Sequence, residues 1–339
     1  MRDDDILILR GPEVERLLAG RELEIIDAVR RAYIAYARGV GSLPHSTFLR
    51  FSGNQPERII ALPAYLGGEW EVAGVKWVAS FPRNPERGLD RASAVIILNS
   101  SLTGRPEAVI EGSIISAKRT AAGAALAAQT LHAGRPVNRI GLIGCGLINM
   151  ETARFLRTVF PELNSFIIYD LDAARSKGFE EKCRQTFDGA EVETARDPQT
   201  VLGAASLIAL ATTATAPHIA DLSMAAPGSV ILHISLRDLS PEVILSCDNV
   251  VDDIEHVCRA QTSAHLAEQL VGNRDFIRCS LADILSGKAG ASNEPTTKTV
   301  FSPFGLGVLD IAVGKLVRDW GLERGEGMTI PSFFPKPFA

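Results

Sequence analysis

Short apolar runs alternate with helix-like stretches from residue 139 onward, and this alternation constrains the fold more than any other feature of the chain. Runs of aliphatic and β-branched residues suit strands that are buried on both faces of a parallel sheet. They lie at residues 140–143, 166–169, 206–210, 230–234 and 250–251. The pattern predicts the α/β fold class, with a Rossmann-type doubly wound parallel sheet in the middle of the chain.

The first 110 residues follow a different pattern. A helical periodicity covers residues 13–38, and strand-like pieces separated by Gly, Pro and Asn follow it at residues 48–51, 59–62, 72–81 and 94–99. This order predicts a mostly antiparallel sheet with a helix packed on it, which is an α+β domain.

A chain of 339 residues is long enough for about two domains without disulfide or metal staples. The alanine-rich segment 112–134 predicts a helix that could act as a hinge. A strand-like piece at 298–302 and a helical pattern at 306–320 come near the C-terminus. We expect one domain to comprise residues 1–134, with 303–339 returning to it, and the other to comprise residues 135–302.

Charge and hydropathy exclude several classes of partner. Lys and Arg number 35 and Asp and Glu number 40, which gives a formal net charge of −5 without any dense basic tract. Nucleic acid is therefore not an expected partner. The N-terminus is acidic, and the longest uncharged stretch is too short to span a bilayer. We expect a cytoplasmic protein with no membrane partner.

Cysteine usage argues against a disulfide or zinc scaffold. The five cysteines are odd in number and form no Cys-x-x-Cys pair, which predicts reduced thiols. The densest ligand-like cluster runs from Asp252 to Cys258, but its spacing matches no standard metal site. Loops between strands and helices often collect such side chains, and we expect no metal.

Two glycines follow the apolar run 140–143 and precede a helix-compatible stretch. Gly144 and Gly146 have no side chains, so backbone N–H groups and a helix dipole can approach a pyrophosphate. The sixth position of the motif is Asn149 instead of Gly or Ala, and we expect this departure to loosen the packing of strand against helix. The alternative is a structural glycine-rich turn.

Asp170 favours dinucleotide binding over that alternative. It ends the next apolar run, 24 residues after Gly146, where a carboxylate can accept hydrogen bonds from an adenosine ribose. The same carboxylate would repel a 2′-phosphate. The sequence therefore predicts NAD, rather than NADP, as the cofactor.

Lys76 lies midway along the strand-like segment 72–81. Strand alternation places it on one face with Val72, Gly74, Val78 and Ser80. The lysine either extends to solvent at a sheet edge or is held in a pocket by an anion.

Arg119 raises a similar question. Lys118 and Arg119 are the charged residues of the alanine-rich segment 112–134. Adjacent helical positions point about 100° apart, so one can reach solvent while the other meets an anionic ligand or a buried carboxylate. An exposed pair is the alternative.

Asp238 follows the apolar run 230–234, and ligands of open parallel sheets lie at the carboxyl ends of the strands. It is therefore a candidate to act on a substrate beside the nicotinamide, although it could instead cap a helix over residues 239–245. Thr212 and Thr213 end the run 206–210 and could meet the cofactor in the same way.

Several motifs together resemble the ornithine cyclodeaminase/μ-crystallin family, and the resemblance runs nearly from end to end. The motifs are Gly74-Val-Lys-Trp77, Arg119-Thr-Ala-Ala122, Ile143-Gly-Cys-Gly-Leu147, the strand-end Asp238 and Ser302-Pro-Phe-Gly-Leu-Gly-Val-Leu-Asp310. Further segments look like the branch that forms 2,3-diaminopropionate for siderophores and peptide antibiotics. They are Arg58-Ile-Ile-Ala-Leu-Pro63, Gly67-Gly-Glu69, Arg91-Ala-Ser93, residues 95–99 and residues 234–243.

The resemblance implies a homodimer in which the N-terminal region and the C-terminal tail form a substrate and dimerisation domain around an inserted Rossmann domain. It also implies that Lys76 and Arg119 bind the substrate carboxylate and that Asp238, with Lys76, serves the catalytic step. Together with the motif, it gives an expected set of NAD-contacting residues: Gly144, Gly146, Leu147, Ile148, Asn149, Asp170, Thr120, Thr212 and Thr213.

The chain departs from ornithine cyclodeaminases at one place in the first sheet. Those enzymes carry an arginine soon after a proline, whereas this chain has Pro44-His45, with Arg50 further on. This departure counts against simple cyclodeamination. His45, Arg50 or Arg91 could bind the additional carboxylates of a larger substrate, and the sequence does not rank them.

The function implied by the resemblance is an NAD-dependent amino acid dehydrogenase that acts on a CH–NH bond. The expected reaction converts N-(2-amino-2-carboxyethyl)-L-glutamate, a small amino acid conjugate, into L-2,3-diaminopropionate and 2-oxoglutarate. An ornithine or lysine cyclodeaminase and a ketimine reductase are alternatives within enzymes. A μ-crystallin-like protein that binds the dinucleotide without turnover is the alternative from another class.

Overall fold

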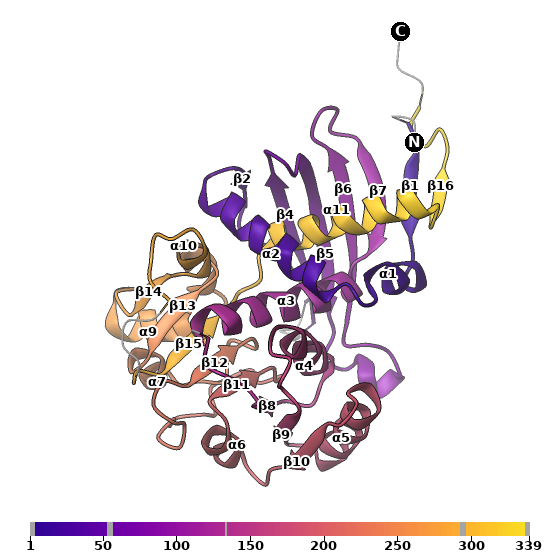
Figure 1. Cartoon of the computed structure of the whole chain (residues 1–339). Helices are drawn as coiled ribbons and strands as arrows, with labels where there is room; N and C mark the ends of the chain where they lie inside the picture. Colours follow the sequence, from indigo (N-terminus) through magenta and orange to yellow (C-terminus); the bar gives the residue numbers. More distant parts are fainter. Residues whose placement is uncertain (1–3, 53–56, 133, 292–295, 336–339) are drawn as a thin grey trace. The chain divides into compact units, whose positions relative to one another are not determined.

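The computed structural model describes residues 4–52, 57–132, 134–291 and 296–335 and divides into two compact units (Figure 1). Unit 1 comprises Met1–Arg119 and Leu306–Ala339, and unit 2 comprises Thr120–Gly305. The expected boundaries lay at residues 134/135 and 302/303. Within the described residues, no helix is both long and apolar enough to cross a membrane.

Unit 1 contains a mixed sheet whose strand order is β16-β1-β7-β6-β5-β4-β2, with β3 also paired to β4. The pair β1–β7 is parallel, and the other pairs are antiparallel. The strands are β1 (Ile6–Leu9), β2 (Gly41–Ser42), β3 (Thr47–Arg50), β4 (Arg58–Leu66), β5 (Val72–Ser80), β6 (Ala92–Ser100), β7 (Pro106–Glu111) and β16 (Met328–Ile330).

The long N-terminal helical pattern forms two helices instead of one. These are α1 (Gly11–Leu18) and α2 (Glu22–Ala37), with Gly20 between them at a φ of +68° that few other residues adopt. The C-terminal helix α11 (Gly307–Arg324) returns to unit 1, where it packs on α2 and lies across β4, β5 and β6 (Figure 1). The short 3₁₀ helix η1 spans Asn84–Arg87.

The two faces of β5 have different surroundings. A Cβ at Gly74 would collide with the carbonyl oxygen of Ile97 and would lie 3.3 Å from Ile311 of α11, so the glycine permits close packing. Lys76 shares this face by strand alternation. Trp77 lies on the opposite face, where it remains 43% exposed beside Val95.

Unit 2 contains an entirely parallel sheet, and the predicted fold class is confirmed. Its strand order is β10-β9-β8-β11-β12-β15-β13-β14. The direction of winding reverses between β8 and β11, which makes their carboxyl ends the topological switch point. The strands are β8 (Arg139–Ile143), β9 (Ser165–Tyr169), β10 (Glu191–Thr194), β11 (Leu207–Leu210), β12 (Val230–His233), β13 (Asp248–Val251), β14 (Ile277–Ser280) and β15 (Thr299–Ser302).

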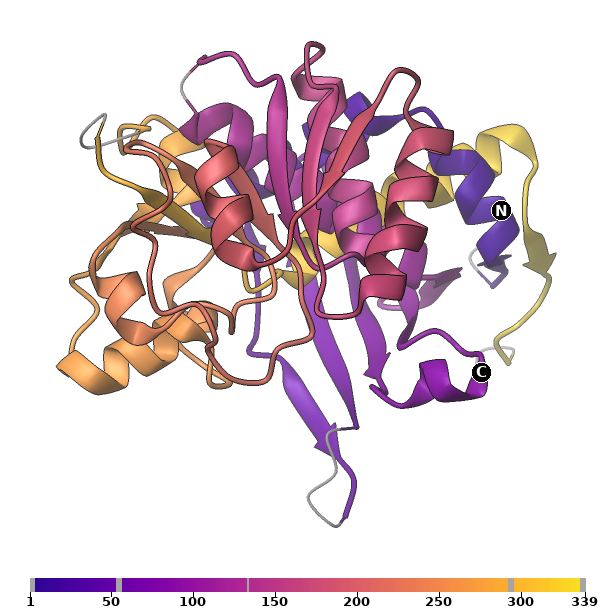
Figure 2. The ribbon, with the colours of Figure 1, turned by 90° about the horizontal axis from the view of Figure 1, so that it is seen from below.

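Helices cover both faces of this sheet, and Figure 2 shows α6 on one side of the central strands and α4 and α5 on the other. Strands β11, β12 and β13 are buried at every residue, as the apolar runs require. The helices are α3 (Ser113–Leu131), which begins in unit 1, α4 (Leu147–Val159), α5 (Ala173–Thr186), α6 (Pro198–Ala204), α7 (Pro241–Leu245), α8 (Ile254–Val257), α9 (Ser263–Val271) and α10 (Leu281–Leu285).

Candidate functional site

The glycine-rich turn connects β8 to α4 at the switch point of unit 2. Gly144 adopts a φ of +95°, and a Cβ there would collide with the carbonyl oxygen of Ala211. Gly146 is the N-cap of α4, and a Cβ at this residue would meet nothing within 4 Å. The first glycine is therefore required by the protein's own packing, whereas the second leaves open space at a helix N-terminus, as a bound pyrophosphate requires.

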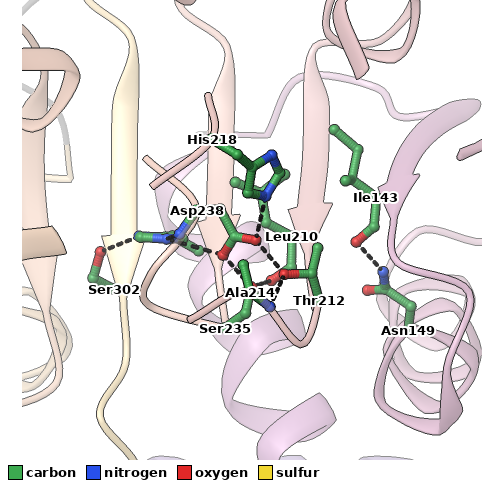
Figure 3. Close-up of polar contacts among 10 residues, drawn as sticks. Ile143, Asn149, Leu210, Thr212, Ala214, His218, Ser235, Asp238 and Ser302 are labelled. Carbon is green, nitrogen blue, oxygen red and sulfur yellow. Dashed lines mark hydrogen bonds and ion pairs between the residues drawn. The ribbon is translucent and has the colours of Figure 1, made fainter. Parts of the chain in front are cut away.

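Asn149 is directed into this turn. The residue is fully buried, and Nδ2 donates to the carbonyl oxygen of Ile143 at 3.0 Å (Figure 3) and to that of Gly144 at 2.7 Å. The expectation that Asn149 loosens the packing is wrong, because its amide ties the end of β8 to the first turn of α4.

Asp170 lies directly after β9 and faces the same turn. Its Oδ2 accepts a hydrogen bond from the backbone N–H of Cys145 at 2.7 Å, and Oδ1 accepts one from Asp172 at 3.0 Å. Both carboxylate oxygens are thus held beside the glycines. An acidic group at this point of a Rossmann fold is suited to the hydroxyls of an adenosine ribose.

The remaining features of the turn fit a dinucleotide. Leu147 is exposed and Ile148 is half-buried, and the first N–H groups of a helix that begins at Leu147 have no intrahelical acceptor. The N-terminus of α4 thus supplies N–H donors, Gly146 leaves open space, and the carboxylate of Asp170 supplies an acceptor for the ribose. Thr120 is a half-buried residue of α3.

Asp238 lies at the centre of a polar network at the carboxyl ends of β11 and β12 (Figure 3). The residue is 0% exposed. Its Oδ1 accepts a hydrogen bond from Oγ1 of Thr212 and lies 3.1 Å from Nε2 of His218. Its Oδ2 accepts a hydrogen bond from Ser235. Thr212 therefore uses its hydroxyl within the protein, while Thr213 is exposed.

His233 completes the network on the buried side. Its Nε2 lies 3.3 Å from Oδ2 of Asp238 and accepts the backbone N–H of Asp238 at 3.2 Å, and its Nδ1 lies 3.2 Å from Oγ of Ser302. Burial alone would raise the pKa of Asp238. Contacts with His233, Ser235 and Thr212 outweigh burial and hold that pKa below its ordinary value.

The alternative role of Asp238 as a helix cap does not apply. The N-cap of α7 is Ser240, whose hydroxyl accepts the backbone N–H of Val243 at 3.3 Å. In the acidic segment further along, Asp253 caps α8 and contacts Nδ1 of His256 at 2.8 Å, and Asp252 accepts backbone N–H groups at 2.7–2.9 Å. These carboxylates serve the backbone, in keeping with the expectation for strand-to-helix loops.

A second cluster, in unit 1, joins Lys76 and Arg119 to Asp310. Nζ of Lys76 lies 2.8 Å from Oδ2 of Asp310, and Nε of Arg119 donates to Oδ1 at 2.8 Å. Lys76 is 3% exposed and Asp310 is 0% exposed. Of the two alternatives for Lys76, a pocket with an anion is the one observed, and the anion is a carboxylate of the chain itself. Arg119 likewise meets a buried carboxylate.

Burial and charge also change the acidity of this cluster. Burial, and then the charge of Arg119, outweigh Asp310 and lower the pKa of Lys76 to about 8. Nζ also donates to Oγ of Ser116 at 3.1 Å. Two cations and one carboxylate leave an excess positive charge in a buried place, which is a suitable site for the carboxylate of a ligand.

The other candidate residues of unit 1 lie apart from this cluster in sequence. Arg50 of β3 is directly opposite Arg58 of β4. Burial, and then the charge of Arg50, lower the pKa of Arg58. His45 is an exposed residue between β2 and β3, and Arg91 is half-buried before β6.

Several residues of these networks were not expected from the sequence, and Asp310 and His218 are the most important of them. Asp310 was visible in the motif 302–310, but nothing in the local sequence pairs it with residues far along the chain. His218 has no local pattern that marks it, because its partner Asp238 is 20 positions away. The sequence also gave no role to Arg58.

Comparisons with known proteins agree with this geometry. The family model for the ornithine cyclodeaminase/mu-crystallin family matches residues 7–325. A curated relative, N-((2S)-2-amino-2-carboxyethyl)-L-glutamate dehydrogenase of Staphylococcus aureus, is 26% identical over 96% of this chain and 98% of its own length.

The fold is also similar to solved structures of enzymes named for amino and imino acids. Thermococcus litoralis Δ¹-pyrroline-2-carboxylate reductase in complex with NADH and L-proline has a TM-score of 0.89 at 26% identity, covering 96% of this chain and 100% of that chain. An archaeal alanine dehydrogenase dimer with bound NAD has a TM-score of 0.87 at 28% identity, covering 97% and 100%. The resemblance is confirmed, and the chain belongs to the ornithine cyclodeaminase/mu-crystallin family.

Proposed function

We propose that this NAD-dependent oxidoreductase oxidises N-((2S)-2-amino-2-carboxyethyl)-L-glutamate at the glutamate α-carbon. Hydrolysis of the resulting imine yields 2-oxoglutarate and L-2,3-diaminopropionate, a building block of siderophores and peptide antibiotics. A relative that matches along almost the whole chain is named for this dehydrogenase activity, and other relatives are named for amino and imino acids, which supports the broader class.

The observation that carries the proposal is the buried cluster of Lys76, Arg119 and Asp310. Its excess positive charge requires an anion, and the carboxylate of an amino acid is the anion that fits both an ammonium and a guanidinium. Binding there would fix the α-carbon of the substrate, and positioning of this kind supplies much of the rate of hydride transfer.

The pair Arg50 and Arg58 supports a substrate with several carboxylates. By strand register, Arg50, Arg58, Leu62 and Lys76 share one face of the sheet, since Lys76 is opposite Leu62. Arg58 and Leu62 are four positions apart on β4, so their Cα atoms are about 13 Å apart. Two guanidinium groups placed opposite each other repel, and an anion between them would relieve that repulsion.

In this proposal, Asp238 orients neighbouring side chains through hydrogen bonds. Because its pKa is lowered, Asp238 stays ionised around neutral pH and accepts hydrogen bonds from Thr212 and Ser235. NAD⁺, when bound at the glycine-rich turn, supplies the hydride acceptor. The Asp238 network lies at the strand ends where ligands of such folds bind, and this supports a role in the proton transfers that accompany oxidation and hydrolysis.

The homodimer is also part of the proposal. The sheet face opposite Lys76 carries apolar side chains that the chain leaves partly exposed, namely Leu49, Trp77 and Val95. A second copy of the chain would remove these side chains from water. A molar mass in solution of two chains is expected, and a monomer at micromolar concentration would contradict the dimer.

Product analysis tests the function directly. The purified protein would be incubated with NAD⁺ and the conjugate, with NADH followed by absorbance and products by mass spectrometry. We expect 2-oxoglutarate and diaminopropionate in equal amounts with NADH. A cyclic imino acid and ammonia from ornithine, or NADH from alanine, with no turnover of the conjugate, would overturn the proposed substrate. Cofactor binding without turnover of any amino acid would favour a binding protein.

A further inference from the structure

His218 is the most exposed of the side chains that contact the Asp238 carboxylate. The side chain of His218 is 39% exposed, whereas Asp238 and His233 are fully buried and Thr212 and Ser235 are half-buried. Figure 3 shows the His218 ring beside the carboxylate, and the two histidines lie near different oxygens of it, His218 near Oδ1 and His233 near Oδ2. His218 therefore connects the buried Asp238 carboxylate with the surface of unit 2.

The ring of His218 is held by contacts at both its backbone and its side chain. The backbone N–H groups of His218 and Ile219 donate to the carbonyl oxygen of Asp238 at 2.9 and 2.8 Å. Nε2 of His218 lies 3.1 Å from Oδ1 of the same residue. Nε2 therefore faces Asp238, and Nδ1 is on the side of the ring away from this contact.

This arrangement suits a general base. A carboxylate accepts a hydrogen bond from Nε2–H, which fixes the neutral tautomer and leaves the lone pair of Nδ1 available. The same negative charge stabilises the imidazolium that forms when Nδ1 takes up a proton. His233 cannot act in this way, because its Nε2 accepts a backbone N–H and its Nδ1 contacts Ser302 inside the fold.

We propose that His218 is the proton-transfer residue of this enzyme, with Asp238 as its positioning residue. The inference rests on the proposed function for the identity of the substrate. After hydride transfer, the substrate carries a protonated C=N bond. As the oxygen of water bonds to this carbon, the water proton passes to Nδ1 of His218. The proton then passes to the nitrogen of the resulting carbinolamine. As the C–N bond breaks, the proton of the carbinol hydroxyl passes through His218 to the released nitrogen, so the imidazole ends neutral and the products are a ketone and a protonated amine.

The test compares two histidine variants of the full-length enzyme. His218→Gln keeps a side-chain amide that can donate to Asp238 but cannot carry a proton. We expect kcat to fall about 10²- to 10⁴-fold while the Kd for NAD⁺ changes less than about twofold. His265→Gln is the matched control, because His265 lies on α9 and contacts Gln261 and Gln269, outside the network. It should retain wild-type kcat.

A pH profile separates proton transfer from a structural role. In the wild type, kcat/KM should fall at acid pH as His218 becomes protonated, and His218→Gln should lack this limb. Asp238→Asn should also lower kcat, because the imidazolium loses its counter-charge. Exogenous imidazole should restore part of the kcat of His218→Ala. Wild-type kcat or an unchanged acid limb in His218→Gln would overturn the inference.

The proposed function and the role of His218 are tested by separate measurements. Turnover of the conjugate by the wild type tests that function, and the variants are compared on whichever amino acid the wild type oxidises. The ¹⁵N chemical shifts of the His218 ring report its tautomer and need no substrate. A tautomer that does not respond to Asp238→Asn would overturn the Asp238–His218 pair even if the conjugate is the substrate.

Discussion

The ammonium of Lys76 and the carboxylate of Asp310 form a buried ion pair, with Nζ 2.8 Å from Oδ2. Lys76 comes from the middle of a strand, and Asp310 lies in the first turn of the helix packed against that strand's sheet. Arg119 binds the other oxygen of the same carboxylate. Asp310 thereby fixes the direction of both cations before any substrate arrives.

Replacing Asp310 should destabilise the enzyme and disorder this cluster. Asp310→Asn leaves Lys76 and Arg119 buried together without a counter-charge, and loss of one member of a buried ion pair costs about 3–5 kcal/mol. Urea denaturation would measure the free energy of unfolding. As a control, Asp319→Asn removes more exposed pairs with Lys315 and Arg318, each of which should cost about 1 kcal/mol or less. Equal losses in the two variants would contradict the assigned role of Asp310.

Substrate affinity should weaken as the pH rises through about 8. The pKa of Lys76 is lowered to about 8, so above this pH the side chain loses the charge that binds a carboxylate. The KM should be flat below pH 8 and rise above it, and Lys76→Arg, which stays charged, should lack the rise. An alkaline limb that persists in Lys76→Arg would assign it to another group.

The same titration has a defined effect on stability. An unfolded lysine keeps its proton to about pH 10.5, so between about pH 8 and 10.5 the unfolded state holds more protons than the folded state. The contribution of Lys76 to the free energy of unfolding should therefore increase with pH across this window. Urea titrations at two pH values, in wild type and Lys76→Met, would measure it.

Gly146→Ala should separate cofactor binding from folding. A Cβ at Gly146 meets nothing within 4 Å and the residue has a φ of −112°, so the free energy of unfolding should change by less than about 1 kcal/mol. The methyl group would occupy the space open to the pyrophosphate, and the Kd for NAD⁺ should rise about tenfold or more. Calorimetry measures both. In Gly144→Ala, by contrast, stability itself should fall, because its Cβ would collide with Ala211.

Asp170→Ala should weaken the binding of NAD⁺ and reduce the enzyme's preference for NAD⁺ over NADP⁺. A hydrogen bond to a charged group contributes about 1.5–3 kcal/mol, so the Kd for NAD⁺ should rise about tenfold or more. Asp172→Ala is the control, since Asp172 caps α5 by accepting the N–H of Ala174. An unaltered ratio of the two cofactors in Asp170→Ala would place ribose recognition elsewhere.

Arg58→Gln should raise the KM for a substrate with several carboxylates by about tenfold or more, because a charged partner is lost. Arg38→Gln, at an exposed position after α2, should leave the KM unchanged. The Kd for NAD⁺ should be the same in both variants. A KM that stays at the wild-type value in Arg58→Gln and in Arg50→Gln would remove this pair from substrate binding.

The sequence predicted the features that depend on local pattern. Uniformly apolar runs predicted β8, β9, β11 and β12, because strands covered on both faces tolerate few polar residues. The glycine-rich turn and Asp170 were visible for the same reason, since each has a fixed place after a strand. Strand β10 was missed because its residues are mostly exposed and polar.

The networks could not be predicted because their members are far apart in the chain. Arg119 and Asp310 are separated by 191 positions, and no spacing rule links them. Sequence alone could say that a lysine inside a strand needs an anion, but not which carboxylate would supply it. The same limit applied to His218, whose role depends on a turn that brings it back to Asp238.

The position of β15 has a consequence for biosynthesis. This strand inserts between β12 and β13, although it is the last strand of unit 2 to leave the ribosome. Unit 1 likewise cannot be completed before α11 and β16 have been synthesised. Unit 2 cannot complete its sheet before residue 302 has been made, and unit 1 cannot complete its sheet before residue 330 has been made, so shorter nascent chains will expose unfinished sheets to chaperones.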